Sequence, residues 1–230
     1  HELRPHAAAV LGIELDHFDF FQSQSQLANS YSQFLQQIDA DGIAICSAGC
    51  PTTVRVAAAA RARVEFFGVD GSADWQARNV SERRGRYRFE LWHRGRPLGA
   101  VQLAVPGKHN VQNALAAAAL AFHGGADAEA ICRGLGRFAG LERRLQTISD
   151  GAAGTIFDDY AHHPTEISAA LAAIRQQIGQ RRLWCVFQPH QVSRTARLLD
   201  TLAASLQNAD KILVAEIFRA REPRRAEGEV

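Results

Sequence analysis

The segment at residues 158–166 constrains the fold of this chain most strongly, because it reads Asp-Asp-Tyr-Ala-His-His-Pro-Thr-Glu. It follows a short apolar run at residues 154–157 and leads into a stretch rich in Ala, Leu and Ile with helical spacing. Pro164, Thr165 and Glu166 suit the first turn of a helix, so the pattern predicts a strand, a polar turn and a helix. In an open α/β sheet such a turn lies at the carboxyl ends of the strands, where ligands bind. For any one of these side chains alone, a capped helix with solvated polar residues is the alternative.

Strand and helix patterns alternate over the first third of the chain. Apolar runs at residues 7–13, 42–46 and 64–67 are typical of buried strands. Helical spacing separates these runs at residues 25–38 and 54–60. Strands that are joined by helical crossovers form a parallel sheet, so we expect an α/β fold.

The region between Asp74 and Ala104 has a different pattern, in which apolar and polar residues alternate and glycines punctuate the runs. This period of two predicts antiparallel strands with one solvated face. Four of the arginines in this region lie close together, at Arg83, Arg84, Arg86 and Arg88. We interpret these arginines as part of the solvated face and not as a nucleic-acid site.

The alternation of strands and helices returns after Asp150. Strand candidates at residues 154–157, 183–187 and 212–215 are separated by helices near residues 165–178 and 196–206. This βαβαβ order predicts a doubly wound arrangement. A second polar turn, at residues 188–195, follows the second of these strands, and we expect both polar turns to face one crevice.

The composition excludes several classes of protein. The chain has 230 residues, of which 47% are hydrophobic, and this is enough for one large domain or two smaller ones. The formal net charge of +2 gives no electrostatic case for binding nucleic acid or an anionic membrane. No stretch is long and apolar enough to predict membrane insertion. The four cysteines lack the paired spacing of a zinc site, so we interpret them as reduced thiols of a cytoplasmic protein.

The chain has two lysines, Lys108 and Lys211, and neither lies in a Gly-Lys-Ser/Thr sequence. A phosphate-binding P-loop requires that sequence. These 230 residues therefore contain no P-loop.

A cluster of carboxylates and an imidazole follows the first strand candidate; it consists of Glu14, Asp16, His17 and Asp19. Carboxylate oxygens suit Mg²⁺, and a neutral imidazole can add a ligand. The cluster therefore predicts either a divalent-cation site or a helix-entry turn with acidic caps.

Two further polar segments suit a nucleotide. Asn110 and Asn113 lie on one side of the first turn of a predicted Ala-rich helix, where free backbone N–H groups suit a phosphate. Capping of the helix by Asn110 is the alternative for that residue. The pair Arg143 and Arg144 follows a glycine-containing turn, and a guanidinium can clamp a phosphate; a surface pair is the alternative.

The motifs occur in the order found in the Mur ligases, which the chain resembles over nearly its whole length. They are residues 107–115 (Gly-Lys-His-Asn-Val-Gln-Asn-Ala-Leu), residues 140–145 (Gly-Leu-Glu-Arg-Arg-Leu), residues 158–166, and residues 187–195 (Phe-Gln-Pro-His-Gln-Val-Ser-Arg-Thr). The last two are similar to those of the branch that joins L-alanine to UDP-N-acetylmuramate. Residues 13–19 resemble the Asn-x-Glu-x-Asp-His segment of that family, with Gly12 in place of the usual Asn.

The resemblance implies an ATP-dependent, Mg²⁺-requiring ligase of peptidoglycan synthesis. In such an enzyme ATP phosphorylates the lactyl carboxylate of UDP-N-acetylmuramate, and the amine of L-alanine attacks the acyl phosphate. It also implies that residues 1–145 are the latter part of a central, P-loop-type ATPase domain with an antiparallel β-ribbon. Residues 146–230 would be an incomplete, Rossmann-like C-terminal domain. Because the P-loop and the family's UDP-binding domain are missing from these residues, we expect this polypeptide alone not to catalyse ligation.

The resemblance also assigns roles to individual residues. Those expected to act on ATP and Mg²⁺ are His17 as a catalytic Mg²⁺ ligand, His109, Asn110 and Asn113 at the nucleotide-contacting helix start, Arg144 as the catalytic arginine on the ATP phosphate, and Asp159 as a nucleotide contact. Those expected to line the cleft towards the muramoyl and amino-acid substrates are Tyr160, His162, His190 and Arg194, with His162 also counted as catalytic.

The chain departs from the family pattern at Gln191, where the alanine-adding enzymes usually have arginine, so one substrate contact differs. No lysine follows His17 where other Mur ligases use a carbamylated one, and this fits the alanine-adding branch. Three alternatives stay open: a murein peptide ligase that recycles tripeptide onto UDP-N-acetylmuramate, a non-catalytic nucleotide-binding remnant, and a plain α/β domain whose polar turns are caps. The turn Gln188-Pro189-His190 favours the alanine-adding enzyme over the peptide ligase.

Overall fold

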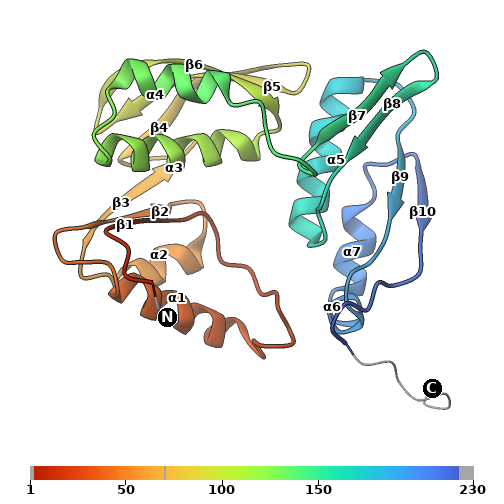
Figure 1. The fold of residues 1–230 in the computed structure, drawn as a ribbon, viewed down its shortest axis with the longest axis horizontal. Coiled ribbons are helices and arrows are strands. Elements are labelled where there is room, and N and C mark those ends of the chain that lie inside the picture. The colour runs from red at the N-terminus through yellow and green to blue at the C-terminus, as the bar shows by residue number, and fades with distance from the viewer. Residues whose placement is uncertain (1–2, 70, 223–230) are drawn as a thin grey trace. The chain divides into compact units, whose positions relative to one another are not determined.

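The computed structural model describes residues 3–69 and 71–222, and the chain divides into two compact units (Figure 1). Unit 1 comprises His1–Leu15 and Phe21–Gly140, and unit 2 comprises Asp16–Phe20 and Leu141–Val230. The chain therefore leaves unit 1 after its first strand, contributes a short segment to unit 2, and returns. None of the helices in the described part of the chain is both long and apolar enough to cross a lipid bilayer.

Unit 1 is built on a six-stranded sheet in which the strands lie in sequence order. The strands are β1 (Ala7–Val10), β2 (Ile43–Ser47), β3 (Arg63–Gly68), β4 (Trp75–Arg83), β5 (Arg86–His93) and β6 (Arg96–Pro106). Pairing is parallel from β1 to β4 and antiparallel from β4 to β6. The predicted parallel sheet and the predicted antiparallel region are both confirmed, and they belong to one continuous sheet.

Helices cover both faces of the parallel part of this sheet, with α1 (Gln24–Gln36) and α2 (Pro51–Ala57) on one face and α3 (His109–His123) on the other. Helix α4 (Ala128–Arg137) packs beside α3 against β6. Alternate residues of a strand point to opposite faces. Accordingly, Ile43 and Ile45 of β2 pack with α3, and Ala44 and Cys46 pack with α1 and α2. The predicted arginine face of β4 and β5 is exposed to solvent, as expected.

Unit 2 contains two separate strand pairs. The antiparallel hairpin is β7 (Gln146–Gly151) with β8 (Gly154–Asp158), and the parallel pair is β9 (Trp184–Phe187) with β10 (Lys211–Val214). Helices α5 (Pro164–Ile178), α6 (Val192–Arg197) and α7 (Leu199–Ser205) lie between these strands in the chain. The sequence did not predict β7, because all of its residues except Gln146 are exposed and it therefore has no apolar alternation.

The helix expected at residues 196–206 was placed wrongly. Helix α6 begins at Val192, inside the segment that was expected to be a turn, and a break at Leu198 separates it from α7. Gln191 makes no side-chain cap, so nothing local marks this helix start. In the first turn of α6, the backbone N–H of Val192 donates to the carboxylate of Glu222, which is 30 residues away along the chain.

The buried carboxylate of Glu65 contacts side chains from several elements of unit 1. The Glu65 side chain is fully buried, and it accepts a hydrogen bond from Trp75 Nε1 at 2.6 Å. His123 Nε2 lies 2.9 Å and His93 Nε2 lies 3.3 Å from the same carboxylate. The ring of His93 stacks on Trp75 with 4.0 Å between centroids. Burial alone raises the pKa of Glu65, but the contacts with His123 and Trp75 outweigh it, so the pKa is lowered.

Two half-exposed arginines complete the surroundings of this carboxylate. Arg63 Nη2 and Arg94 Nη2 lie 3.2 Å and 3.1 Å from Glu65 Oε1. Because they come from β3 and from the turn after β5, Glu65 joins segments that are distant along the chain. Removal of a buried partner leaves the opposite charges uncompensated, and that is the costly change.

We predict that Glu65→Ala lowers the free energy of unfolding by about 3 kcal/mol, because the two arginines lose their counter-charge and Trp75 Nε1 loses its buried hydrogen-bond acceptor. Urea denaturation followed by circular dichroism measures this loss. The matched control is Glu129→Ala, which removes an exposed carboxylate 2.6 Å from Arg133 and should change little. Equal midpoints for the two variants would contradict the prediction.

Candidate functional site

The polar turn before α5 is fixed by the helix cap. His163 is the N-cap residue, and Pro164 occupies the first turn. The Glu166 carboxylate accepts hydrogen bonds from the backbone N–H groups of His162 at 3.2 Å and His163 at 3.4 Å. The His163 Nδ1 atom accepts a further one from Thr165 N at 3.4 Å. This reciprocal capping confirms the predicted helix start and fixes the backbone of His162.

Asp159 acts as a clamp between two backbone segments. Its two carboxylate oxygens accept hydrogen bonds from Leu145 N at 2.8 Å and from Ala161 N at 2.7 Å. Arg143 and Leu145 have φ angles of 57° and 50°, in the left-handed region that most residues avoid. A residue keeps such a backbone conformation where neighbouring contacts fix it, and the hydrogen bonds to Asp159 are such contacts. The expected contact of Asp159 with a nucleotide stays a prediction.

The two arginines of the same turn flank Tyr160. The guanidinium of Arg143 lies 4.6 Å from the centre of the Tyr160 ring, and that of Arg144 lies 5.9 Å from it. Arg144 Nη1 is 3.7 Å from Glu166 Oε1, and the Arg144 side chain is about half exposed. A half-exposed guanidinium keeps donors available, and its fork geometry matches a phosphate or a carboxylate. The expected contact of Arg144 with a phosphate stays a prediction.

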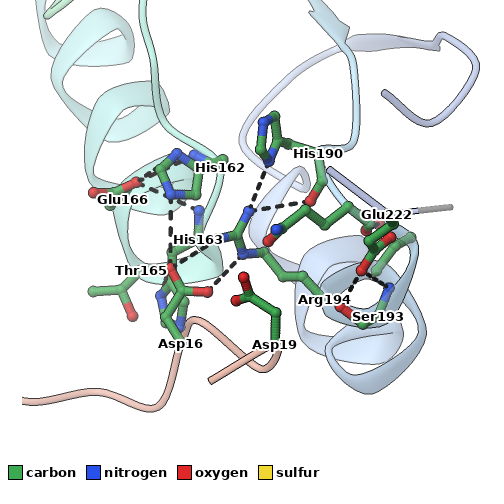
Figure 2. Close-up of polar contacts among 12 residues, drawn as sticks. Asp16, Asp19, His162, His163, Thr165, Glu166, His190, Ser193, Arg194 and Glu222 are labelled. Atoms are coloured by element: carbon green, nitrogen blue, oxygen red, sulfur yellow. Dashed lines mark hydrogen bonds and ion pairs between the residues drawn. The ribbon is translucent and has the colours of Figure 1, made fainter. Parts of the chain in front are cut away.

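Arg194 is the centre of the polar cluster in unit 2 (Figure 2). Its side chain is only 4% exposed, and it pairs in a fork with Asp16, through Nε to Oδ1 at 2.6 Å and Nη2 to Oδ2 at 3.1 Å. Its Nη1 atom donates to the carbonyl oxygen of His190 at 3.1 Å and lies 3.2 Å from His190 Nδ1. All three guanidinium nitrogens are thus engaged, which explains how a charged side chain is tolerated at this depth.

His162 lies on the other side of the Asp16 carboxylate. His162 Nε2 is 3.7 Å from Asp16 Oδ2, and the ring stands 6.1 Å from that of His190. The Asp16 carboxylate raises the pKa of His162, although burial opposes this. Burial and the positive charge of Arg194 lower the pKa of His190. Burial alone raises the pKa of Asp16, but His162 and Arg194 outweigh it and hold that pKa well below its usual range. The two imidazoles therefore have pKa values shifted in opposite directions, and they lie beside one guanidinium.

His17 follows Asp16 in the segment that belongs to unit 2. It is exposed and has a φ angle of 54°. No group of three ligand side chains around His17 lies within coordination reach in the described residues; the one such group found there is the exposed set His6, Asp39 and Asp41 in unit 1. Mg²⁺ prefers oxygen ligands and commonly keeps several waters beside substrate phosphates, so the expected role of His17 as a Mg²⁺ ligand stays a prediction. Asp16, an expected member of the cation cluster, is instead bound by Arg194.

The start of α3 lies in unit 1. Helix α3 begins at His109, and its N-cap residue, Lys108, makes no side-chain cap. Asn110 is inside the helix and donates from Nδ2 to the Pro106 carbonyl oxygen at 2.7 Å, so the alternative of an Asn110 cap is wrong. Asn113 Nδ2 donates to Asn110 Oδ1 at 3.0 Å, and the two amides thus share one side of the first turn, as expected.

Sequence reasoning missed two carboxylates that shape this site. The sequence predicts Asp16 only as a candidate metal ligand and predicts no role for Glu222. Glu222 accepts hydrogen bonds from the backbone and hydroxyl of Ser193, 29 residues away, and Asp16 is separated from Arg194 by 178 residues. No local pattern encodes pairings at such distances, so the sequence held no signal for them.

Comparison with protein-family models gives two matches. The Mur ligase middle domain matches residues 1–121, and the Mur ligase, glutamate ligase domain matches residues 143–229. Curated relatives include proteins named UDP-N-acetylmuramate--L-alanine ligase. The one from Salinibacter ruber is 37% identical over 96% of this chain and 46% of that protein. The one from Aquifex aeolicus is 33% identical over 96% of this chain and 49% of that protein. The chain thus spans about half the length of the curated relatives it matches.

Solved structures share the fold. The UDP-N-acetylmuramate-alanine ligase MurC from Thermotoga maritima matches with a TM-score of 0.76 and 24% identity, over 95% of this chain and 47% of that chain. MurF from Acinetobacter baumannii matches with a TM-score of 0.74 and 26% identity, over 94% of this chain and 51% of that chain. The expected Rossmann-like α/β class is consistent with both neighbours.

We predict that Asp16→Asn lowers the pKa of His162, because the neutral amide no longer favours the imidazolium while burial still opposes it. In the unchanged chain, His162 titrates above and His190 below the ordinary value of 6.5. The raised pKa of His162 means that its pairing stabilises the folded state below pH 6.5 and that this contribution is lost as the pH rises through the folded pKa. NMR titration of the histidine ring protons measures both values. Asp19→Asn is the control, and an unchanged His162 titration in Asp16→Asn would count against the pairing.

Proposed function

Because the chain belongs to the Mur ligase family, we propose that it forms part of a cytoplasmic, ATP-dependent enzyme that joins L-alanine to the lactyl carboxylate of UDP-N-acetylmuramate. Two observations together support the proposal. Relatives at 33–37% identity over almost the whole chain bear the name of that ligase. In unit 2, the residues that match the substrate-facing motif, His162, His190 and Arg194, lie in one polar cluster.

The reaction consists of two transfers. The γ-phosphoryl group of ATP moves to a lactyl carboxylate oxygen, which gives an acyl phosphate and ADP. The amine of L-alanine then attacks the acyl carbon, inorganic phosphate leaves, and the amine gives up a proton. Phosphoryl transfer depends on positioning and on neutralising charge. Mg²⁺, when bound, would supply part of that neutralisation on the phosphate oxygens, with His17 as a protein ligand.

The chain's own residues have distinct tasks in this scheme. Arg144 is half exposed beside Tyr160 and binds phosphate oxygens through its fork. The start of α3, with His109, Asn110 and Asn113, receives the nucleotide. Helix starts suit phosphates, and amide side chains suit the edge of a purine base.

The lactyl carboxylate is an anion, so its binding site needs positive charge. His162, whose pKa the Asp16 carboxylate raises, is the side chain of the cluster that meets this need, and Arg194 fixes Asp16 beside it through the forked contact. The Tyr160 ring lies 5.1 Å from that of His162. His190, whose pKa is lowered, is the neutral imidazole of the group and can accept a proton from an attacking amine. Gln191 leaves the cluster with one cation fewer than the family pattern has.

We predict that UDP-N-acetylmuramate perturbs the NMR signals of Tyr160, His162, His190 and Arg194 in this chain. Arg194→Lys should weaken the apparent affinity at least about tenfold, because lysine cannot make the forked contact with Asp16 that fixes the cluster. Arg197→Lys, one turn along the same helix, is the matched control and should bind like the unchanged chain. Equal affinities for the two variants, or no perturbation of the cluster, would refute this use of the site. L-Alanine and the tripeptide are then added in turn, and a response only to the tripeptide would favour the peptide ligase.

A second prediction concerns turnover. The chain alone should release no phosphate from ATP in the presence of UDP-N-acetylmuramate, L-alanine and Mg²⁺, because no Gly-Lys-Ser/Thr loop is among its residues. A phosphate-release assay tests this. Robust turnover that is abolished by Arg144→Ala would overturn the expectation and place the whole reaction within these residues.

A further inference from the structure

Two segments that follow neighbouring strands lie side by side in unit 2. One is the turn after β9, which carries His190 and leads into α6, and the other follows β10. Phe218 N donates to the Pro189 carbonyl oxygen at 2.8 Å, and Gln191 N donates to the Phe218 carbonyl oxygen at 2.8 Å. His190 and Phe218 thus form a parallel bridge outside the named strands. The second segment therefore fixes the backbone of His190 from the side.

Glu222, four residues further on, fixes the start of α6. Its carboxylate accepts hydrogen bonds from Val192 N, from Ser193 N at 3.1 Å and from the Ser193 hydroxyl (Figure 2). The N-cap residue, Gln191, makes no side-chain cap of its own, so Glu222 supplies what a local cap normally supplies. Burial raises the pKa of Glu222, but the bonds from Ser193 and Val192 outweigh it and the pKa is lowered. Glu222 is thus held in its charged form.

The residue between these two clamps has an unfavourable backbone. Gln191 has a φ angle of 70° and is 3% exposed. A residue other than glycine keeps such a conformation where neighbouring contacts over-determine it. Here Phe218 holds the backbone N–H of Gln191 itself, and Glu222 holds the two N–H groups that follow. Loss of either clamp frees Gln191 to relax towards negative φ.

A relaxed Gln191 changes the direction of Arg194. Arg194 is in the first turn of α6, and its guanidinium donates back to the His190 carbonyl oxygen, across Gln191. We propose that Glu222 is a positioning residue that sets the geometry of Arg194 and His190 through the start of α6. Its part in catalysis rests on the proposed function, whereas its effect on Arg194 does not.

The test is hydrogen exchange of the Arg194 Nε proton, observed by NMR in the 230-residue chain. Glu222→Gln should speed this exchange at least about tenfold, because charge-assisted hydrogen bonds at the helix start are weakened. The matched control is Asp210→Asn, which alters another carboxylate of unit 2 that accepts from Leu183 N and Arg175 Nη2. That variant should lower the melting temperature without changing the Arg194 signal. Faster exchange at Val192 and Ser193 with unchanged exchange at Arg194 would overturn the proposal.

Two further measurements keep the result interpretable. If Glu222→Gln does not fold, Ser193→Ala removes one of the bonds while keeping the charge, and a smaller increase in Arg194 exchange is expected. Titration with UDP-N-acetylmuramate then separates the two proposals. Weaker binding in Glu222→Gln than in Asp210→Asn supports positioning for the substrate. If the unchanged chain does not bind the compound, this chain holds no substrate site of its own, and the exchange data still decide whether Glu222 positions Arg194.

Discussion

The fork between Arg194 and Asp16 is the interaction on which the arrangement of unit 2 depends. A guanidinium that is 4% exposed must have a counter-charge and hydrogen-bond acceptors, or its burial becomes prohibitive. Asp16 supplies both through a segment that leaves unit 1 and belongs to unit 2 by its contacts. The same carboxylate raises the pKa of His162. One negative charge therefore sets the ionisation of its neighbours and fixes where the arginine points.

Carboxylates that accept backbone N–H groups are the recurring device of this unit. Asp159 holds the turn of Arg143 and Arg144, Glu166 caps α5, and Glu222 caps α6 from a distance. Apart from α5, the elements of unit 2 are short, and short helices and strands leave many polar backbone groups without partners in the same element. Each carboxylate satisfies such groups and also fixes the backbone beside a side chain of the candidate site. Stability and positioning are thus served by the same contacts.

The chain belongs to the Mur ligase family, and its polar cluster also differs from the expected family pattern at one position. Gln191, where the resemblance leads one to expect arginine, is buried with a positive φ angle between two backbone clamps. Arg194 is therefore the guanidinium that this turn contributes to the cluster, and its contacts with Asp16 and His190 fix its direction.

The sequence by itself determined the classes of element and the polar motifs. Periodicity showed the parallel strands, the antiparallel region and α5, because burial of one face imposes that periodicity on neighbouring residues. Pro164 and Glu166 indicated where α5 begins, because the residues that cap a helix locally lie in or next to its first turn in the sequence. Only the tertiary structure decided that Asp16 binds Arg194 rather than joining a cation cluster, that α6 begins at Val192, and that Asp159 clamps backbone. Each of these rests on a charge or a hydrogen-bond acceptor brought from a distant part of the chain, and such pairing is a property of the folded arrangement, which leaves no periodic trace in the sequence.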